Sequence, residues 1–198
     1  MKPYTVIFIG PQGSGKGTQI EKLDTVLHEK DPVRRLVDIQ TGRRFRAMAA
    51  KLETFAERKV AKSLDSGELQ PDFLTYVLWG QAMLDQLDAK SHVLVDGFPR
   101  TLTQAKVLDE ALEFFERKEV QIINLDTPEA VVRKRMFERA RNDDTAESIE
   151  ERLRWYREDT IPVINFYKER KDTFVHNIDG TVSIEDVHTQ ILSALKLI

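Results

Sequence analysis

The sequence contains no cysteine, which excludes disulfide bonds and cysteine-ligated zinc. No apolar run approaches the length of a membrane-spanning helix, and no repeat or low-complexity tract is present. The chain has 30 Lys and Arg residues against 33 Asp and Glu, and its net charge of −3 offers no general attraction to nucleic acid or an anionic membrane. We therefore expect a soluble cytoplasmic protein with no nucleic-acid or membrane partner. Any anion site must then be a local cluster of arginines.

The 198 residues are 41% hydrophobic and 32% charged, an ordinary globular composition. A chain of this length can bury a substantial core, as one domain or as one domain with small insertions. The four histidines, at positions 28, 92, 176 and 188, have neither the spacing of a metal site nor that of a catalytic triad. We interpret them as structural or surface residues.

A glycine-rich segment near the start is the most specific pattern: Gly10-Pro11-Gln12-Gly13-Ser14-Gly15-Lys16-Gly17-Thr18-Gln19. The apolar run 5–9 before it predicts a buried strand, and Ile20, Leu23 and Leu27 after it have helical spacing. Strand, glycine-rich turn and helix are the setting of a phosphate-binding loop, whose backbone N–H groups and helix N-terminus surround an anion. The weaker alternative is a glycine-rich surface turn beside a solvated lysine.

The loop differs from the usual pattern in one position. A hydroxyl residue normally follows the lysine and binds Mg²⁺. Here Gly17 follows Lys16, and the hydroxyl comes one residue later, at Thr18. We therefore expect Mg²⁺ to be held mainly by phosphates and water.

The rest of the chain alternates between strand and helix patterns. Further strands are predicted at 33–39, 92–96, 120–125 and 174–178. Helices are predicted from about 43 to 67 and over 72–90, 101–117, 128–139, 145–158, 161–170 and 184–197. Within them we place Phe73, Val77, Leu78 and Leu84 on the apolar side of helix 72–90. Asp144 is placed at the N-cap of helix 145–158. This order predicts an α/β fold with a five-stranded, parallel, doubly wound sheet covered by helices on both faces.

Ligands of such sheets bind beyond the carboxyl ends of the strands, and three candidate ligand-binding segments are predicted to lie there. They are the glycine-rich loop, Thr41-Gly42, and Asp96-Gly97-Phe98-Pro99-Arg100. Asp96 is placed to orient the water shell of Mg²⁺, although a turn residue is the alternative. Gly97 and Pro99 form a rigid corner that aims Arg100, whose guanidinium can donate two hydrogen bonds to a phosphate.

The loop, with its Gly-Lys-Gly-Thr ending, and the segment 96–100 together resemble the signatures of nucleoside monophosphate kinases, adenylate kinases in particular. The resemblance covers about residues 5–195, because Thr41-Gly42-x-x-x-Arg46 is similar to the family's acceptor segment and 177–183 to its terminal segment. It implies a P-loop kinase fold as a single domain. The core would comprise 1–40, 73–138 and 145–198, with an acceptor-binding insertion at about 41–72 and a very short lid at about 139–144.

The resemblance also implies a role for each site residue. ATP would be bound by Gly13, Ser14, Gly15, Lys16, Gly17, Thr18 and Arg135. AMP would be bound by Thr41, Arg46, Leu69, Gly97, Arg100 and Gln104. The catalytic set would be Lys16, Arg100, Arg139, Arg141 and Arg152, and Asp96 would contact Mg²⁺ through water.

The residue chemistry is compatible with these roles. Arg135 and Arg139 are four residues apart on one predicted helix, so their charges repel unless an anion lies between them; a solvated basic face is the alternative. The amide of Gln104 offers a donor and an acceptor, which match the edge of adenine; an exposed helical glutamine is the alternative.

The sequence departs from the family in two places. Only one residue separates Arg139 from Arg141, where the family has a longer lid loop, so we expect a clipped lid that lets ATP be hydrolysed. Arg43 follows Thr41-Gly42 where the family commonly has Asp. It either strengthens monophosphate binding or faces solvent.

The function we predict is reversible, Mg²⁺-dependent phosphoryl transfer from ATP to AMP, giving two ADP, by a monomer. No general base is needed, because the phosphate of AMP is already an anionic nucleophile. Two alternatives stay open: a CMP/UMP kinase of the same fold, and a non-catalytic nucleotide-dependent switch protein.

Overall fold

The computed structural model describes residues 1–139, 141 and 143–198. In this part of the chain five strands form one sheet in the order β2-β3-β1-β4-β5. They are β1 (Thr5–Ile9), β2 (Leu36–Gln40), β3 (His92–Asp96), β4 (Val120–Asp126) and β5 (Thr173–Asp179). Every pairing between them is parallel. The predicted five-stranded parallel α/β sheet is therefore confirmed.

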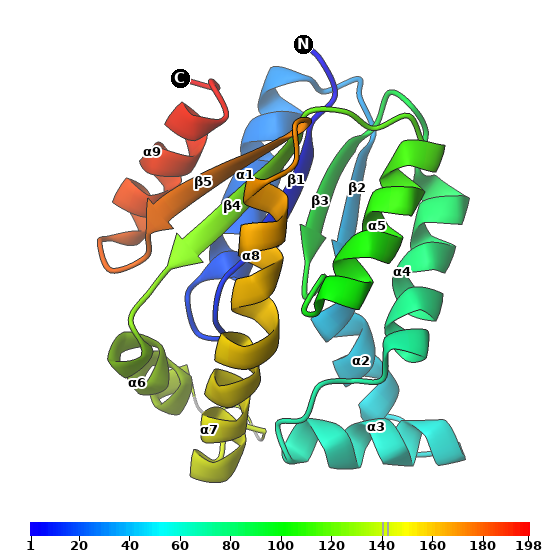
Figure 1. Cartoon of the computed structure of the whole chain (residues 1–198), viewed down its shortest axis with the longest axis vertical. Helices are drawn as coiled ribbons and strands as arrows, with labels where there is room; N and C mark the ends of the chain where they lie inside the picture. The colour runs from blue at the N-terminus through cyan, green and yellow to red at the C-terminus, as the bar shows by residue number, and fades with distance from the viewer. Residues whose placement is uncertain (140, 142) are drawn as a thin grey trace.

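Helices cover both faces of the sheet (Figure 1). On one face α1 (Lys16–Lys30) and α9 (Ile184–Ala194) pack against the strands. On the other lie α4 (Asp72–Gln86), α5 (Leu102–Phe114) and α8 (Ile161–Lys168). Successive residues of β1 serve the two cores alternately, since Val6 and Phe8 belong to one hydrophobic cluster and Ile7 and Ile9 to the other. A strand buried on both faces explains the unbroken apolar run 5–9.

The remaining helices gather where the strands end. They are α2 (Thr41–Ala49), α3 (Phe55–Asp65), α6 (Glu129–Arg139) and α7 (Ala146–Trp155), and Figure 1 shows them beyond the arrowheads, opposite the two termini. The predicted insertion, about 41–72, contains α2 and α3, and its separation from a core stays a prediction. The predicted lid, about 139–144, includes Ala140 and Asn142, which lie outside the described residues.

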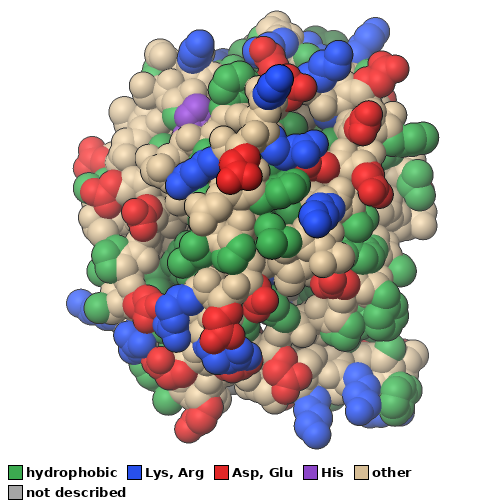
Figure 2. Space-filling view, viewed as in Figure 1, with side chains coloured by type: hydrophobic (Ala, Val, Ile, Leu, Met, Phe, Trp, Pro, Cys, Tyr) green, Lys and Arg blue, Asp and Glu red, His purple; other side chains and the backbone are tan. Residues whose placement is uncertain are grey.

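The prediction for helix α4 was wrong about its buried side. Phe73, Val77 and Leu84 are 64%, 62% and 69% exposed, whereas Trp79 and Met83 are buried. Trp79 stacks on Phe98 with ring centroids 5.1 Å apart. The helix carries apolar residues on both sides, so helical spacing alone could not select the face that the sheet covers. Figure 2 shows hydrophobic side chains over the outer side of α4.

Helix α7 differs from its prediction at both ends. Thr145, not Asp144, is the N-cap: its side chain accepts from the N–H of Ser148, whose hydroxyl interacts in return with the backbone of Thr145. At its other end α7 continues through a π-helical turn, Tyr156–Thr160, directly into α8. Pro162 lacks an N–H group, so the regular ladder cannot continue at that point, and a widened turn replaces the predicted break. None of the described helices is both long and apolar enough to cross a membrane.

Candidate functional site

The loop between β1 and α1 is held against the start of α6. Gly13 has a φ of +85°, and a Cβ atom there would lie 2.8 Å from the carbonyl oxygen of Val132. Only glycine tolerates both the left-handed backbone and this approach. The loop is thereby fixed in a tight curve beside α6, a form compatible with the predicted phosphate-binding loop.

Lys16, the first residue of α1, folds back over the loop. Its Nζ donates to the carbonyl oxygens of Gly10, at 2.9 Å, and Pro11, at 2.7 Å. Burial lowers the pKa of Lys16 to about 7, and the charge of Arg100 adds to this effect, while Asp96 opposes it. The side chain is 6% exposed. Lys16 therefore lies where a bound phosphate would replace the loop carbonyls as its partner.

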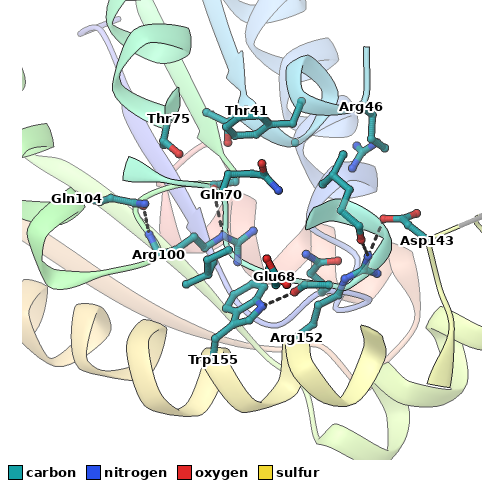
Figure 3. A pocket seen from close by; sticks show the side chains of 17 residues that line it. Thr41, Arg46, Glu68, Gln70, Thr75, Arg100, Gln104, Asp143, Arg152 and Trp155 are labelled. Atoms are coloured by element: carbon teal, nitrogen blue, oxygen red, sulfur yellow. Dashed lines mark hydrogen bonds and ion pairs between the residues drawn. The ribbon is translucent and has the colours of Figure 1, made fainter. Parts of the chain in front are cut away.

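Two adjoining pockets open at the carboxyl edge of the sheet. The first, which we call the loop pocket, is lined by the glycine-rich loop together with the basic and acidic residues that surround it, Arg43, Arg46, Asp96, Arg100, Arg135, Arg139 and Arg141. The second, the insertion pocket, lies between α2, α4, α5 and α7 (Figure 3). Its lining includes Thr41, Arg46, Leu69, Thr75, Gly97, Arg100, Gln104, Arg152 and Trp155.

The two pockets meet at a pair of arginines. Arg46 and Arg100 line both of them, as do Gln12, Gly42 and Gly97. Burial lowers the pKa of each arginine from its ordinary value, and for Arg46 the nearby charge of Arg141 adds to the effect. Cations that are crowded and partly desolvated in this way favour an anion between them. A negative group at the junction would be reached from both pockets.

The corner after β3 aims Arg100 at this junction. Gly97 has a φ of +90°, and a Cβ atom there would lie 2.3 Å from Oγ1 of Thr41. The Nε of Arg100 donates to the carbonyl of Gly97 at 2.9 Å, and its guanidinium lies 5.3 Å from the ring centroid of Trp155. Gly97 and Thr41 both line the insertion pocket, and their binding of AMP stays a prediction.

Two carboxylates pair with the arginines that come from α6 and α7. Asp144 accepts from Arg139 at 2.6 and 2.9 Å and from Arg152 at 2.7 Å, while Asp143 accepts from Arg152 at 2.7 Å. Burial alone would raise the pKa of Asp144, but the hydrogen bonds and charges of Arg139 and Arg152 hold it below its usual range. Arg152 faces the insertion pocket and Arg139 the loop pocket. The pairing fixes the direction of both guanidinium groups.

Gln104 is buried, which excludes the alternative interpretation as an exposed helical glutamine. It is 2% exposed and lines the insertion pocket. Its Oε1 accepts from the backbone N–H of Arg100 at 2.7 Å, and its Nε2 donates to Oδ1 of Asp72 at 2.8 Å. Figure 3 shows it on the same side of the pocket as Thr75, opposite Arg152 and Trp155.

Asp96 ends β3 beside the loop. Its Oδ1 is buried and has no hydrogen-bond partner among the described residues. Buried carboxylate oxygens are normally paired, so this atom fits a position prepared for water or a hydrated ion. In the loop pocket it lies close enough to Lys16 and Arg100 to affect the pKa of both.

Two further arginines have definite partners. Arg135 on α6 donates to the carbonyl of Gly180 at 2.9 Å, which joins α6 to the segment after β5. For Arg43 the sequence left two interpretations, monophosphate binding or exposure to solvent. Arg43 forms an ion pair with Glu21 on α1, and both residues line the loop pocket. Arg43 therefore bridges α1 and α2 at the rim of the loop pocket.

Several lining residues could not be found from the sequence. Thr75 and Trp155 carry no motif, and Gln12 occupies a variable position of the loop pattern, yet all three line the insertion pocket. Asp72 was identified as the start of a helix and as the end of the acceptor-binding insertion, but no partner was predicted for its side chain. Its contact with Gln104 joins residues 32 positions apart, which no local pattern reveals.

A parallel sheet, a phosphate-binding loop that ends in a buried lysine, and two pockets sharing arginines define a P-loop phosphotransferase of the nucleoside monophosphate kinase class. A sequence model of the family described as adenylate kinase matches residues 8–172 of the chain. Adenylate kinase 1 of Nostoc sp. is 40% identical over 190 residues, covering 96% of this chain and 97% of the relative. Adenylate kinases of Corynebacterium urealyticum and Archaeoglobus fulgidus are 37% and 33% identical, and each alignment covers at least 96% of this chain and 98% of the relative. The chain belongs to the adenylate kinase family.

Proposed function

We propose that this chain transfers the terminal phosphoryl group of ATP reversibly to AMP and so produces two molecules of ADP. The observation that carries the proposal is the junction of the two pockets. Arg46 and Arg100 line both pockets there, with Lys16 on the side of the loop. ATP bound in the loop pocket and AMP in the insertion pocket would place donor and acceptor phosphates on either side of these cations.

Each site residue then has a positional or electrostatic task. Loop N–H groups and Lys16 bind the donor phosphates, and Arg46 and Arg100 bind the phosphate of AMP. Arg139, Arg141 and Arg152 would stabilise the charge that spreads over the oxygens of the transferring group. Asp143 and Asp144 hold Arg139 and Arg152 in direction, and no side chain has to remove a proton.

We also propose that Mg²⁺ accompanies ATP. The buried, unpaired Oδ1 of Asp96 fits a water molecule of the ion's hydration shell. Gly17 leaves the loop without a hydroxyl beside Lys16, so the phosphates and water would supply the remaining ligands. A bound Mg²⁺ would supply positive charge that offsets the negative charge of the ATP phosphates.

The chain is further proposed to act as a monomer in the cytoplasm, where ATP and AMP occur together. Residues of one chain line both pockets, which supports transfer by a single chain. The charge of −3 makes nucleic acid an unfavourable partner.

An acceptor panel tests the function. ADP formation from Mg²⁺-ATP is measured with AMP, CMP, UMP and GMP at equal concentrations, and we expect AMP to be the preferred acceptor. Preference for CMP or UMP would assign the chain to pyrimidine monophosphates. Tight ATP binding without acceptor-dependent ADP would instead indicate a nucleotide-dependent switch protein.

A further inference from the structure

Both ends of the Gln104 side chain are held by groups of fixed hydrogen-bonding character. A backbone N–H, that of Arg100, can only donate, so the atom 2.7 Å from it must be the amide oxygen. The Asp72 carboxylate can only accept, so the atom 2.8 Å from it must be the amide nitrogen. The two contacts together define the orientation of an amide that would otherwise have two nearly equivalent positions.

Turning this amide by 180° would be unfavourable at both ends. Its nitrogen would then face the N–H of Arg100, and its oxygen would face the carboxylate of Asp72. Gln104 is 2% exposed, so water cannot compensate for the two lost hydrogen bonds. We call these two hydrogen bonds the lock of Gln104. Of the two partners, only Asp72 contributes a side chain, so Asp72 is the partner that a substitution can remove.

The orientation determines what Gln104 offers to the insertion pocket. One N–H and one oxygen lone pair remain after the two internal hydrogen bonds are made. This pair complements a base edge in which an amino group adjoins a ring acceptor, as N6 and N1 do in adenine. A 6-oxopurine presents the reverse order, with an oxygen acceptor beside an N–H donor, and would meet the amide acceptor to acceptor and donor to donor.

We propose that Asp72 is a positioning residue that determines base specificity: by locking Gln104, it makes the insertion pocket select 6-aminopurine monophosphates and reject 6-oxopurine monophosphates. The proposal rests on the proposed function, since it requires AMP in this pocket. Asp72 lies at the start of α4 and Gln104 in the first turn of α5. The lock therefore also joins the end of the predicted insertion to a helix that covers the sheet.

Asp72 has other tasks from which this one must be separated. A carboxylate in the first turn of α4 stabilises the helix through its dipole, and the hydroxyl of Tyr76 donates to Oδ2 of Asp72 at 3.4 Å. Tyr76→Phe removes that second contact and leaves Oδ1 and Gln104 untouched. It is the matched control, because it perturbs Asp72 without releasing the amide.

The experiment compares AMP with inosine monophosphate, which has the same size and differs at positions 6 and 1 of the purine. The quantity measured is the ratio of the two kcat/KM values in the wild type, Asp72→Asn, Tyr76→Phe and Gln104→Ala. Both nucleotides are assayed on one preparation, so the ratio does not depend on how much of a variant is folded.

We expect the wild type to prefer AMP and Asp72→Asn to lose about tenfold or more of this preference. The amide of Asn can donate or accept, so Gln104 is free to turn. A tenfold loss corresponds to about 1.4 kcal/mol. Tyr76→Phe is expected to keep the wild-type ratio. Gln104→Ala gives the ratio in the absence of hydrogen bonds between residue 104 and the edge of the base. If Asp72→Asn does not fold, Asp72→Ser replaces it, because a hydroxyl can also donate or accept.

Two results would overturn the proposal. One is an Asp72→Asn ratio equal to that of the wild type. The other is an equal fall in Asp72→Asn and Tyr76→Phe, which would assign the effect to the start of α4. Failure of the proposed function gives a different result, because the wild type would then not phosphorylate AMP at all.

Discussion

At the scale of single residues, Lys16 combines burial with a charge that the reaction needs. Its ammonium group donates to two loop carbonyls, and burial lowers its pKa to about 7. A phosphate in the loop would bring opposite charge within contact distance and raise that pKa. We therefore expect the binding of ATP and the protonation of Lys16 to be coupled.

This coupling predicts proton uptake when ATP binds. At pH 8 Lys16 is mostly neutral before binding and charged afterwards, so up to about one proton is taken up per ATP. At pH 6 Lys16 is charged in both states and contributes no uptake. Calorimetric titrations in two buffers of different ionisation enthalpy measure the number of protons. Lys16→Arg, which stays charged, is the control; equal uptake in it and in the wild type at pH 8 would rule out Lys16 as the source.

Removal of the charge should abolish most turnover. Lys16→Met deletes the group that contacts the outer phosphates, and we expect ADP formation to fall by about 100-fold or more. Lys22→Met is the matched control, because Lys22 lies on the same helix and pairs with Glu185 outside both pockets. Near-normal kcat in Lys16→Met would refute the assignment.

At the scale of elements, helix α7 closes the insertion pocket against the end of α3. Gly67 approaches Ser148 so closely that a Cβ atom would lie 2.4 Å from the carbonyl of Ser148. Nε1 of Trp155 donates to the carbonyl of Gly67 at 3.0 Å, and Arg152 donates to the carbonyl of Leu64 at 3.2 Å. The insertion pocket is thus lined by residues of α7, an element that follows the predicted lid in the chain.

The connection between α6 and α7 is short, so we expect it to exclude water from bound ATP less well than a long lid does. Helix α6 ends at Arg139 and α7 begins at Ala146, which leaves little chain to cover the loop pocket. We expect ADP formation without AMP, as a fraction of AMP-dependent turnover, to be several-fold higher than in a long-lid adenylate kinase, on the order of fivefold. Lys16→Met gives the background from contaminating hydrolysis. Equal fractions in the two enzymes would show that the short connection excludes water equally well.

Sequence patterns predicted the elements better than their contacts. The buried strands have continuous apolar runs, and the loop motif sets its own local geometry, so both could be recognised from adjacent residues. The buried face of α4 was mistaken, because apolar residues lie on both sides of that helix and the choice depends on Phe98 and the sheet. The Asp72–Gln104 contact likewise depends on how two helices pack, and the sequence showed only a helix start and a glutamine.

At the scale of the whole molecule, the two edges of the sheet have different tasks. The carboxyl edge holds the arginines of the site, and the opposite edge ties the strands together through Arg117. Its guanidinium donates to Oγ1 of Thr5 at 2.9 Å, to the carbonyl of Tyr4 at 3.1 Å and to that of Ala89 at 3.2 Å.

His92 lies at the same edge of the sheet. Its Nδ1 accepts from the N–H of Tyr4 at 3.0 Å, and the rings of Tyr4 and His92 stack with their centroids 5.8 Å apart. A buried neutral imidazole thus links the N-terminal segment to β3.

Acid should destabilise the folded chain through His92, because the folded structure keeps this imidazole neutral. His92 is 1% exposed, and burial lowers its pKa to about 4, with the charge of Arg34 adding to the effect. Between about pH 6.5 and pH 4 the unfolded chain binds a proton at His92 that the folded chain does not. The free energy of unfolding therefore decreases as the pH is lowered, by up to about 1.4 kcal/mol per pH unit from this group.

The free energy of unfolding in urea, measured at several pH values across this window, is compared between the wild type and His92→Gln. We expect the variant to be less stable near pH 7 and its stability to depend less on pH, because other titrating groups contribute equally to both proteins. Parallel slopes in the wild type and His92→Gln would show that His92 does not titrate differently on folding.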